Sequence, residues 1–405
     1  MKKSPVFFLL VFAVFLLSFT PFHFSTQDSL YILKMDASSK EERTAITSLG
    51  VAIEEVKPNY IVGIAHEDSL QKLTAHSFKF EAKPLKQFLL DFPVKDADFH
   101  NYSEMEAELK SFAEKYPHIA ELSSIGESIQ QRKLYIMRLS GPTPSSTPKP
   151  AIIFMGLHHA REHLSAEVPY FLIKHLLENY GKDEKITQLM DEREIWVLPM
   201  VNPDGAEYDI ESGVYKFWRK NVRSEGADRM YGVDLNRNYG YRWGQEGASD
   251  NPRAETYRGP HAFSEPETQA VKRFVESHPN ITILLSYHTY SELILYPWGH
   301  TYHDIEDPQD FGVHKTLATE VGRITGYKPQ QASDLYITSG DTTDWSYGTH
   351  GIYSFTIELY PGSMWEGGFY PSAAKIQKVV HDNIPAALYL IDTADHPRKV
   401  LPNLN

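Results

Sequence analysis

Two patterns of hydrophobic and polar positions divide the chain near residue 90. Before this point, Leu30–Leu33 and Tyr60–Ile64 are short runs rich in β-branched and aromatic residues, which predict strands. Lys40–Leu49 and Asp68–Leu73 have the composition of short helices. Two strands and two helices in so short a segment predict a small α+β unit, to which we assign residues 27–90.

Beyond this unit, the predicted elements are longer and alternate in type. Lys83–Gln87, which contains lysine and proline, predicts an exposed hinge between the two parts. Four apolar runs predict buried strands, at Ala151–Leu157, Ile195–Val201, Ile281–Tyr287 and Ile352–Ile357. Three stretches predict helices, at Ala166–Tyr180, Glu265–Ser277 and Val313–Thr325. Strands that alternate with helices predict an α/β domain over residues 91–405 with a largely parallel sheet.

The amino terminus has the pattern of a targeting segment. Lys2 and Lys3 precede an apolar run, Val6–Phe19, that is short for a membrane span. We therefore predict a signal peptide over residues 1–26 and a secreted protein. A retained amino-terminal anchor is the alternative, because no clean cleavage site with small residues follows the run.

Composition narrows the classes of partner. Of the 405 residues, 41% are hydrophobic and 23% are charged, as in ordinary soluble proteins. The formal charge of −13 argues against nucleic acid as a partner, because binding to phosphates needs a clustered basic surface. We expect a monomer that is free of the membrane after processing. The chain has no cysteine, which excludes thiol nucleophiles, thiolate zinc ligands and disulfide bonds.

Residues that bind metals or transfer protons follow three of the four apolar runs. His158–His163, with the sequence HHAREH, follows the first run, His288 follows the third and Glu358 follows the fourth. In open α/β sheets, sites form at the carboxyl ends of the strands, where several loops converge. We therefore expect these side chains to meet at one edge of the sheet.

This set of side chains suits zinc, which in hydrolases takes three nitrogen or carboxylate ligands and keeps one position for water. A close His/Glu pair with the distant His288 would supply the three ligands. His159 and Glu162 form one such pair. However, His158 with Glu162, or His159 with His163, would also be suitably spaced. Spacing alone leaves these pairings open.

Five motifs in the same order as in a known family extend the argument. They are HAREH at 159–163, WRKNVR at 218–223, DLNRNYG at 234–240, SYHTYSE at 286–292 and the block Tyr336–Leu359. With these motifs the chain resembles the zinc carboxypeptidases of the pancreatic carboxypeptidase A type, and within them the secreted bacterial carboxypeptidase T group. The resemblance spans residues 91–405. It implies a mixed, mainly parallel central sheet flanked by helices, preceded by a small α+β pro-segment.

The resemblance also implies roles for the residues of the catalytic centre. Its His-x-x-Glu pattern selects His159, Glu162 and His288 as the ligands of Zn²⁺, so that His158 and His163 become neighbours that pack or orient the ligands. Glu358 matches the glutamate that takes a proton from water and passes it to the leaving amine. Arg219 matches the cation that stabilises the developing oxyanion. The adjacent Lys220 fits a solvated basic face better.

Further matches concern the substrate, which we expect to be the carboxyl terminus of a peptide or protein. Asn236 and Arg237 match the clamp for the terminal carboxylate, because a guanidinium can grip both oxygens. Tyr336 matches a mobile tyrosine that closes over the substrate. Two further pairs line subsites: Arg161 and Tyr290 match the next subsite inward, and Thr343 and Asp341 belong to the pocket for the terminal side chain. A neutral threonine near an aspartate predicts broad release of hydrophobic residues and some basic ones.

The resemblance finally implies a precursor. We expect residues 27–90 to inhibit the enzyme until cleavage near Leu90–Asp91; a permanent accessory domain is the alternative. Calcium is an expected structural ion among such relatives, although no compact motif assigns its ligands. Two rival functions are a cell-wall peptidase acting on γ-glutamyl–diaminopimelate bonds and a non-catalytic peptide-binding module. The first is disfavoured by Arg237 and Tyr336, and the second by the complete set of ligands and general base.

Overall fold

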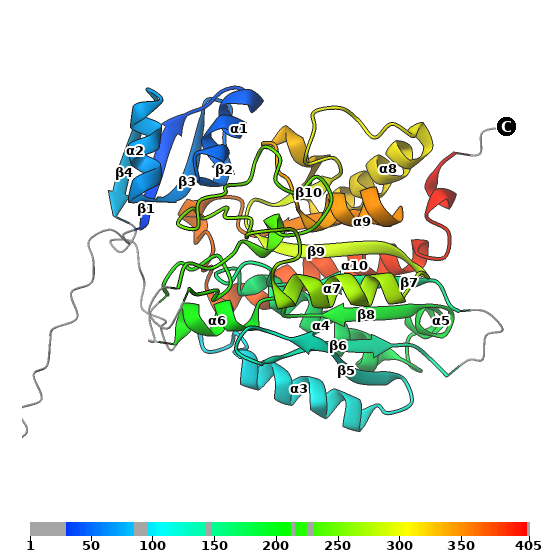
Figure 1. Ribbon diagram of the computed structural model, residues 1–405. Coiled ribbons are helices and arrows are strands. Elements are labelled where there is room, and N and C mark those ends of the chain that lie inside the picture. Colours follow the sequence, from blue (N-terminus) through cyan, green and yellow to red (C-terminus); the bar gives the residue numbers. More distant parts are fainter. Residues whose placement is uncertain (1–29, 85–95, 143–147, 212–214, 226–229, 403–405) are drawn as a thin grey trace, which may run out of the picture.

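The structure is a computed structural model, and its described residues are 30–84, 96–142, 148–211, 215–225 and 230–402 (Figure 1). The predicted signal peptide and the predicted cleavage point at Leu90–Asp91 lie outside these residues. Within them, no helix is both long and apolar enough to cross a membrane.

The larger sheet has, in the described residues, eight strands in the order β11-β10-β12-β9-β7-β8-β6-β5. Their bounds are β5 Ala120–Glu127, β6 Lys133–Leu139, β7 Ala151–Met155, β8 Glu194–Leu198, β9 Ile281–Thr289, β10 Leu293–Tyr296, β11 Lys328–Gln331 and β12 Tyr353–Leu359. The four central strands β12, β9, β7 and β8 are parallel, whereas β10 and β6 run antiparallel to the central strands that they join. The predicted mixed, mainly parallel sheet is therefore confirmed.

Helices cover both faces of this sheet, and β7 illustrates the result. Ile152 and Phe154 belong to the hydrophobic cluster beneath α4 and α10, whereas Ile153 and Met155 belong to the cluster beneath α7. Successive strand residues point to opposite faces, so a strand buried on both faces is apolar at every position. The helix bounds are α3 Tyr102–Lys115, α4 Leu164–Asn179, α5 Glu184–Glu192, α6 Pro203–Ile210, α7 Pro266–Ser277, α8 Pro308–Thr325, α9 Thr342–His350 and α10 Ile376–Thr393.

The amino-terminal unit, residues 30–84, forms a separate antiparallel sheet in the order β2-β3-β1-β4. Its elements are β1 Leu30–Asp36, α1 Lys40–Ser48, β2 Ala52–Val56, β3 Tyr60–His66, α2 Glu67–Ala75 and β4 Phe80–Pro84. The predicted α+β unit therefore has two more strands than expected, β2 and β4. Lys83 and Pro84 pair with β1, so the predicted hinge at Lys83–Gln87 begins too early.

This unit packs directly on the larger domain, at one end of the molecule (blue in Figure 1). The Asn251 side-chain amide donates a hydrogen bond to Asp68 of α2 at 3.0 Å. Gly50, which follows α1, has φ +97°, and a Cβ there would lie 2.9 Å from Cβ of Ala254. Glycine is therefore required at this position, both for the left-handed backbone and for the close approach of the two parts.

Candidate active site

Three neighbouring parallel strands bring the predicted catalytic side chains together. His288 lies near the end of β9 and Glu358 near the end of β12, and the two residues are direct partners across this strand pair. His159 and Glu162 lie in the turn between β7, the other neighbour of β9, and the helix α4. The strand order therefore explains how residues far apart in the sequence reach one edge of the sheet.

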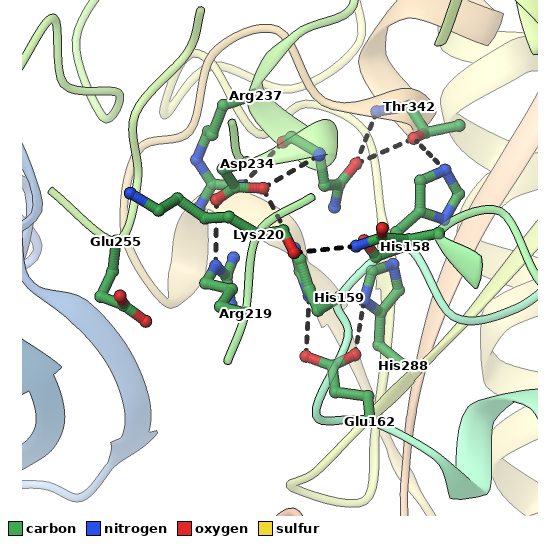
Figure 2. A network of polar contacts seen from close by, with 12 residues as sticks. His158, His159, Glu162, Arg219, Lys220, Asp234, Arg237, Glu255, His288 and Thr342 are labelled. Atoms are coloured by element: carbon green, nitrogen blue, oxygen red, sulfur yellow. Dashed lines mark hydrogen bonds and ion pairs between the residues drawn. The ribbon is translucent and has the colours of Figure 1, made fainter. Parts of the chain in front are cut away.

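His159, Glu162 and His288 form a compact, buried triad (Figure 2). Nδ1 of His159 lies 2.7 Å from Oε1 of Glu162, and Nδ1 of His288 lies 2.9 Å from Oε2. The outer nitrogens have partners of their own: Nε2 of His159 lies 3.2 Å from Asp234, and Nε2 of His288 lies 3.0 Å from the Ser286 hydroxyl. Two imidazole nitrogens and a carboxylate that converge, with oriented outer nitrogens, fit the ligand chemistry of Zn²⁺.

The two other histidines of the HHAREH segment point elsewhere. Nε2 of His163 lies 3.1 Å from Asp209, and Nε2 of His158 lies 2.9 Å from the Tyr239 hydroxyl. Neither belongs to the triad, which is the only group of three or more potential metal-binding side chains found in the described part of the chain. Within the described residues, no second group of this kind supports the expected calcium ion.

Asp234 links the triad to Arg219. One carboxylate oxygen lies against His159, and the other accepts a hydrogen bond of 3.0 Å from Nε of Arg219. Burial alone would raise the pKa of Asp234, but the positive charge of Arg219 and its neighbours holds it well below the usual value. Asp234 is therefore a fixed negative charge that orients a metal ligand and a cation at the same time.

Glu358 lies close to several other charges. Burial raises the pKa of its carboxyl well above the usual value, and the negative charges of Glu162 and Glu54 act in the same direction. Arg219 and Arg237 act in the opposite direction. The carboxyl therefore binds a proton more tightly than an exposed glutamate does, which suits a group that accepts and returns a proton.

A single cavity of about 640 Å³ connects these groups with most of the predicted substrate residues. The predicted residues that line it are His159, Glu162, Arg219, Asn236, Arg237, Tyr290, Tyr336, Asp341, Thr343 and Glu358. His288 and Arg161 are not among the residues that line this cavity. The cavity has the size of a small-molecule site and combines a metal triad with several fixed cations.

Backbone carbonyl groups hold Arg237 in this cavity. Its Nε donates a hydrogen bond to the carbonyl of Gly247 at 3.2 Å, and its Nη1 donates to the carbonyl of Asn236 at 2.8 Å. Arg237 is 3% exposed, and the hydrogen bonds found for it go to carbonyl groups rather than to a carboxylate. A fixed guanidinium of this kind is suited to binding a carboxylate.

Asp341 has a structural role as well as a place in the cavity wall. One carboxylate oxygen accepts from the backbone N–H of Asp344 at 2.9 Å and so caps α9, and the other accepts from the Thr338 hydroxyl at 3.1 Å. Thr343, in the first turn of α9, has its hydroxyl 3.3 Å from that of Thr356. The predicted pocket for the terminal side chain is therefore lined mainly by hydroxyl groups and one carboxylate.

Arg161 and Tyr336 contact the amino-terminal unit. The Arg161 guanidinium is fully buried, donates to Glu255 at 3.0 Å and to Glu54 of β2, and stacks 4.2 Å from the Phe369 ring. Tyr336 packs against the hydrophobic core of the amino-terminal unit, and its hydroxyl donates to the Ile53 carbonyl at 3.4 Å. Among the described residues, the buried Tyr290 hydroxyl has no hydrogen-bond partner.

Lys220 corrects one prediction. The sequence favoured a solvated basic face, yet Lys220 is 1% exposed. Its ammonium donates to the carbonyl groups of Pro252 and Ala254, at 2.9 and 2.8 Å, and burial lowers its pKa to about 8. Lys220 therefore stabilises the loop that packs on the amino-terminal unit.

Sequence reasoning also missed the residues that support the site, namely Asp234, Ser286 and Thr342. Each lies within one of the five family motifs, but the resemblance implied no role for it. Ser286 could have been found, because a residue two positions before His288 in a strand shares its face. Glu54 and Glu255 gave no sequence signal, since their contacts with Arg161 join segments distant in the chain.

Comparisons with known proteins agree with this site. The zinc carboxypeptidase family profile matches residues 105–386. A zinc carboxypeptidase of Saccharothrix mutabilis subsp. capreolus is 37% identical over 313 residues, which cover 75% of this chain and 71% of that protein. Carboxypeptidase B of Bos taurus is 31% identical over 298 residues, which cover 72% and 70%. The crystal structure of carboxypeptidase A from Helicoverpa armigera has the same fold, with a TM-score of 0.76 at 20% identity over 91% of this chain and 98% of that one.

The family match, the relatives and the His-Glu-His triad support one conclusion about identity. They confirm the expected resemblance and the expected Zn²⁺. Enzymes of this class are exopeptidases that act on the carboxyl termini of peptides. The chain therefore belongs to the zinc carboxypeptidase family and is a metallocarboxypeptidase.

Proposed function

We propose that this protein is a secreted precursor whose catalytic domain, residues 91–405, releases hydrophobic and some basic residues from peptide carboxyl termini. The observation that carries the proposal is the single cavity, where part of the metal triad, Glu358, Arg219 and Arg237 meet. An enzyme that removes the last residue of a peptide needs a metal site, a base, an oxyanion-stabilising cation and a carboxylate-binding cation within the length of one substrate residue.

In the proposed mechanism, His159, Glu162 and His288 hold Zn²⁺, which would polarise the scissile carbonyl and lower the pKa of a bound water. Glu358 accepts a proton from the attacking water and returns it to the leaving amine. Its raised pKa supports this role, because a carboxylate that binds a proton more tightly is a stronger base toward the attacking water. Arg219, fixed by Asp234, stabilises the negative charge that develops on the carbonyl oxygen.

We assign selection for the chain end to further residues of the same cavity and to the neighbouring Arg161. Arg237 and Asn236 bind the terminal carboxylate, and Tyr336 closes over the bound residue. Arg161 and Tyr290 contact the part of the substrate that lies inward of the scissile bond. Thr343 and Asp341 line the side-chain pocket, where the neutral hydroxyl accepts apolar residues and the carboxylate accepts some basic ones.

We further propose that residues 27–90 are an inhibitory pro-segment. The support is a set of contacts on two substrate-binding elements. Glu54 is ion-paired with Arg161, so that an acidic side chain occupies the inner subsite. On the other side, Arg43 of α1 donates to the carbonyl groups of Asp334 and Leu335, and the Thr44 hydroxyl accepts from the Ile337 N–H at 3.1 Å. The segment that carries Tyr336 is thereby held by the pro-segment.

The remaining assignments complete this picture of a precursor. Residues 1–26 act as the signal peptide, cleavage near Leu90–Asp91 releases the active enzyme, and the enzyme acts as a monomer. The rival cell-wall peptidase would act on γ-glutamyl bonds. A substrate panel separates this activity from release of ordinary carboxyl-terminal residues.

A peptide panel tests the proposal directly. Blocked chromogenic peptides with apolar, basic or acidic terminal residues are incubated with the intact protein and after limited proteolysis. We expect cleavage of apolar and basic termini only after proteolysis, and loss of all cleavage with a chelator. Equal activity before and after proteolysis would contradict the pro-segment, and cleavage of γ-glutamyl peptides alone would contradict the substrate class. Asp341→Asn should reduce cleavage of basic termini relative to apolar ones.

A further inference from the structure

His158 is fully buried, yet it belongs to neither the metal triad nor the lining of the cavity. Its Nδ1 lies 3.1 Å from the Ser286 hydroxyl, and its Nε2 lies 2.9 Å from the Tyr239 hydroxyl and 3.2 Å from the Thr342 hydroxyl. These partners connect His158 to two other parts of the site. Ser286 contacts the triad residue His288, and Thr342 contacts Asn236.

The direction of the hydrogen bonds can be determined from the Asn236 end. The backbone N–H of Thr342 donates to Oδ1 of Asn236 at 2.9 Å, so this atom is the amide oxygen and not the nitrogen. The Thr342 hydroxyl lies 2.8 Å from the same oxygen and must donate to it, because a carbonyl oxygen only accepts. A hydroxyl has one proton, so Thr342 presents a lone pair to His158.

This lone pair determines the tautomer of His158. An unprotonated Nε2 could accept from the Tyr239 hydroxyl but would face the lone pair of Thr342, whereas a protonated Nε2 donates to both oxygens, so we place the proton on Nε2. A buried imidazole without a carboxylate partner is neutral, and its Nδ1 is then an acceptor. The Ser286 hydroxyl must therefore donate to Nδ1 of His158.

The same reasoning determines which nitrogen of His288 carries the proton. Because the single proton of Ser286 is directed to His158, the oxygen of Ser286 accepts from Nε2 of His288, 3.0 Å away. A proton on Nε2 leaves the lone pair of His288 on Nδ1, the nitrogen that faces Glu162 and His159. Metal ligation requires such a neutral nitrogen with a free lone pair.

We propose that His158 is a positioning residue that, through Ser286, fixes the metal-binding tautomer of His288 and, through Thr342, joins the metal site to Asn236. This inference rests on the proposed ligand role of His288. The chain of hydrogen bonds also orients Asn236. Its Oδ1 is used by Thr342, so its amide N–H groups are left for the cavity and for a substrate carboxylate.

The zinc affinity of the full-length protein tests this chain of hydrogen bonds without any substrate. The dissociation constant is measured by competition with a chromogenic chelator. Loss of an outer partner of a ligating histidine costs about 10–100-fold in metal affinity, so we expect this range for Ser286→Ala. Thr342→Val keeps the shape but removes the hydroxyl, and we expect a smaller loss of about 3–10-fold, because Thr342 acts through His158 and touches no ligand itself. Thr342→Ser is the matched control and should bind zinc like the wild type.

Two results would overturn the inference: unchanged zinc affinity in Thr342→Val, or equal losses in the valine and serine variants. If Thr342→Val does not fold, the tautomer can be read from ¹⁵N NMR of the wild-type histidines, with His158→Asn to assign the signal. A proton on Nδ1 of His158 would contradict the proposal. His288→Ala tests the proposed ligand role of His288 separately from the positioning role of His158. If this variant still bound zinc, His288 would not be a ligand.

Discussion

The two sides of the active-site cleft obtain their support from different parts of the molecule. On the metal side, the partners of the triad are Asp234 and Ser286, which both belong to the catalytic domain. On the substrate side, Arg161 and Tyr336 contact Glu54 and Ile53 of the amino-terminal unit. All the partners of the metal triad therefore lie in the catalytic domain. In contrast, two residues of the substrate side make contacts with a segment that we propose to be removed on processing.

This difference separates two requirements of a precursor. A metal site whose outer partners are all internal can form before processing, so cleavage has no need to create it. The substrate side holds a buried guanidinium whose Nη2 is occupied by Glu54. Removal of the amino-terminal unit would expose this donor to a peptide. Processing should thus change access to substrate and leave zinc affinity alone.

The largest expected effect concerns the metal side in the processed enzyme. Glu358→Gln keeps the shape of the side chain but cannot accept a proton. We expect kcat to fall by about 10²–10⁴-fold, the usual contribution of a general base, with KM and zinc content nearly unchanged. Steady-state kinetics on a chromogenic peptide and metal analysis measure this. Glu366→Gln, an exposed acid near the cleft, is the control. Retained turnover in Glu358→Gln would remove Glu358 from its role.

A second substitution tests whether the metal side is independent of the amino-terminal unit. Asp234→Asn should weaken zinc binding by about 10–100-fold, because it removes the charged outer partner of His159. The ratio to wild type should be the same before and after processing, as chelator competition on both forms would reveal. A ratio that differs between the two forms would mean that the amino-terminal unit supports the metal site after all.

The third test addresses the substrate side. Glu54→Gln in the intact protein removes the charge that faces Arg161, so the amino-terminal unit should hold the cleft less tightly. We expect about a tenfold rise in peptide hydrolysis by the uncleaved protein, less than the loss of a whole buried charge pair would cause, because the glutamine oxygen can still accept from Arg161. Glu81→Gln, an exposed acid on β4 of the same unit, should have no effect. After processing, both variants lose the substituted residue and must match the wild type. No rise in Glu54→Gln would show that this pair does not restrain the precursor.

The sequence allowed the central strands to be predicted and concealed the outer ones, for a physical reason. β7 and its parallel neighbours are covered on both faces, so their residues form continuous apolar runs. The strand β5 has the sequence AELSSIGE with many exposed positions, and β2 has two glutamates among its five residues. Such strands lack the apolar signal, although each is paired with a neighbouring strand, with one irregularity in the register.

In the candidate site, too, some residues could be predicted from the sequence and others could not. The chemical nature of His159, Glu162 and Glu358 and their places after strands suggested a metal site, and the motifs selected among the pairings. Lys220 could not be placed from the sequence, because its burial depends on the carbonyl groups of a loop more than thirty positions away. The partner of Arg161 could not be foreseen either, since it requires the docking of two separately folded parts.

The smallest effect concerns stability, at a residue that does not line the cavity. Glu267, in the first turn of α7, is fully buried, and its nearest acidic neighbours are Glu265 and Asp204. Burial raises its pKa to about 8, and the charges of these neighbours act in the same direction. In the unfolded chain the group ionises near its ordinary value of 4.5. The folded protein therefore holds one more proton between these two pH values, and this group makes stability fall as pH rises through that window.

Glu267→Gln should remove this contribution, which amounts to at most about 1.4 kcal/mol of unfolding free energy per pH unit. Between pH 6 and 8, the variant should lose less stability than the wild type, as urea unfolding at several pH values would measure. Glu276→Gln, which replaces an exposed acid near the other end of α7, is the matched control for the substitution. Zinc affinity should not change in the Glu267 variant. Parallel stability curves for the wild type and Glu267→Gln would mean that this carboxyl is ionised in the folded protein, with Asn221 and the Ile129 N–H sufficient to hold its charge.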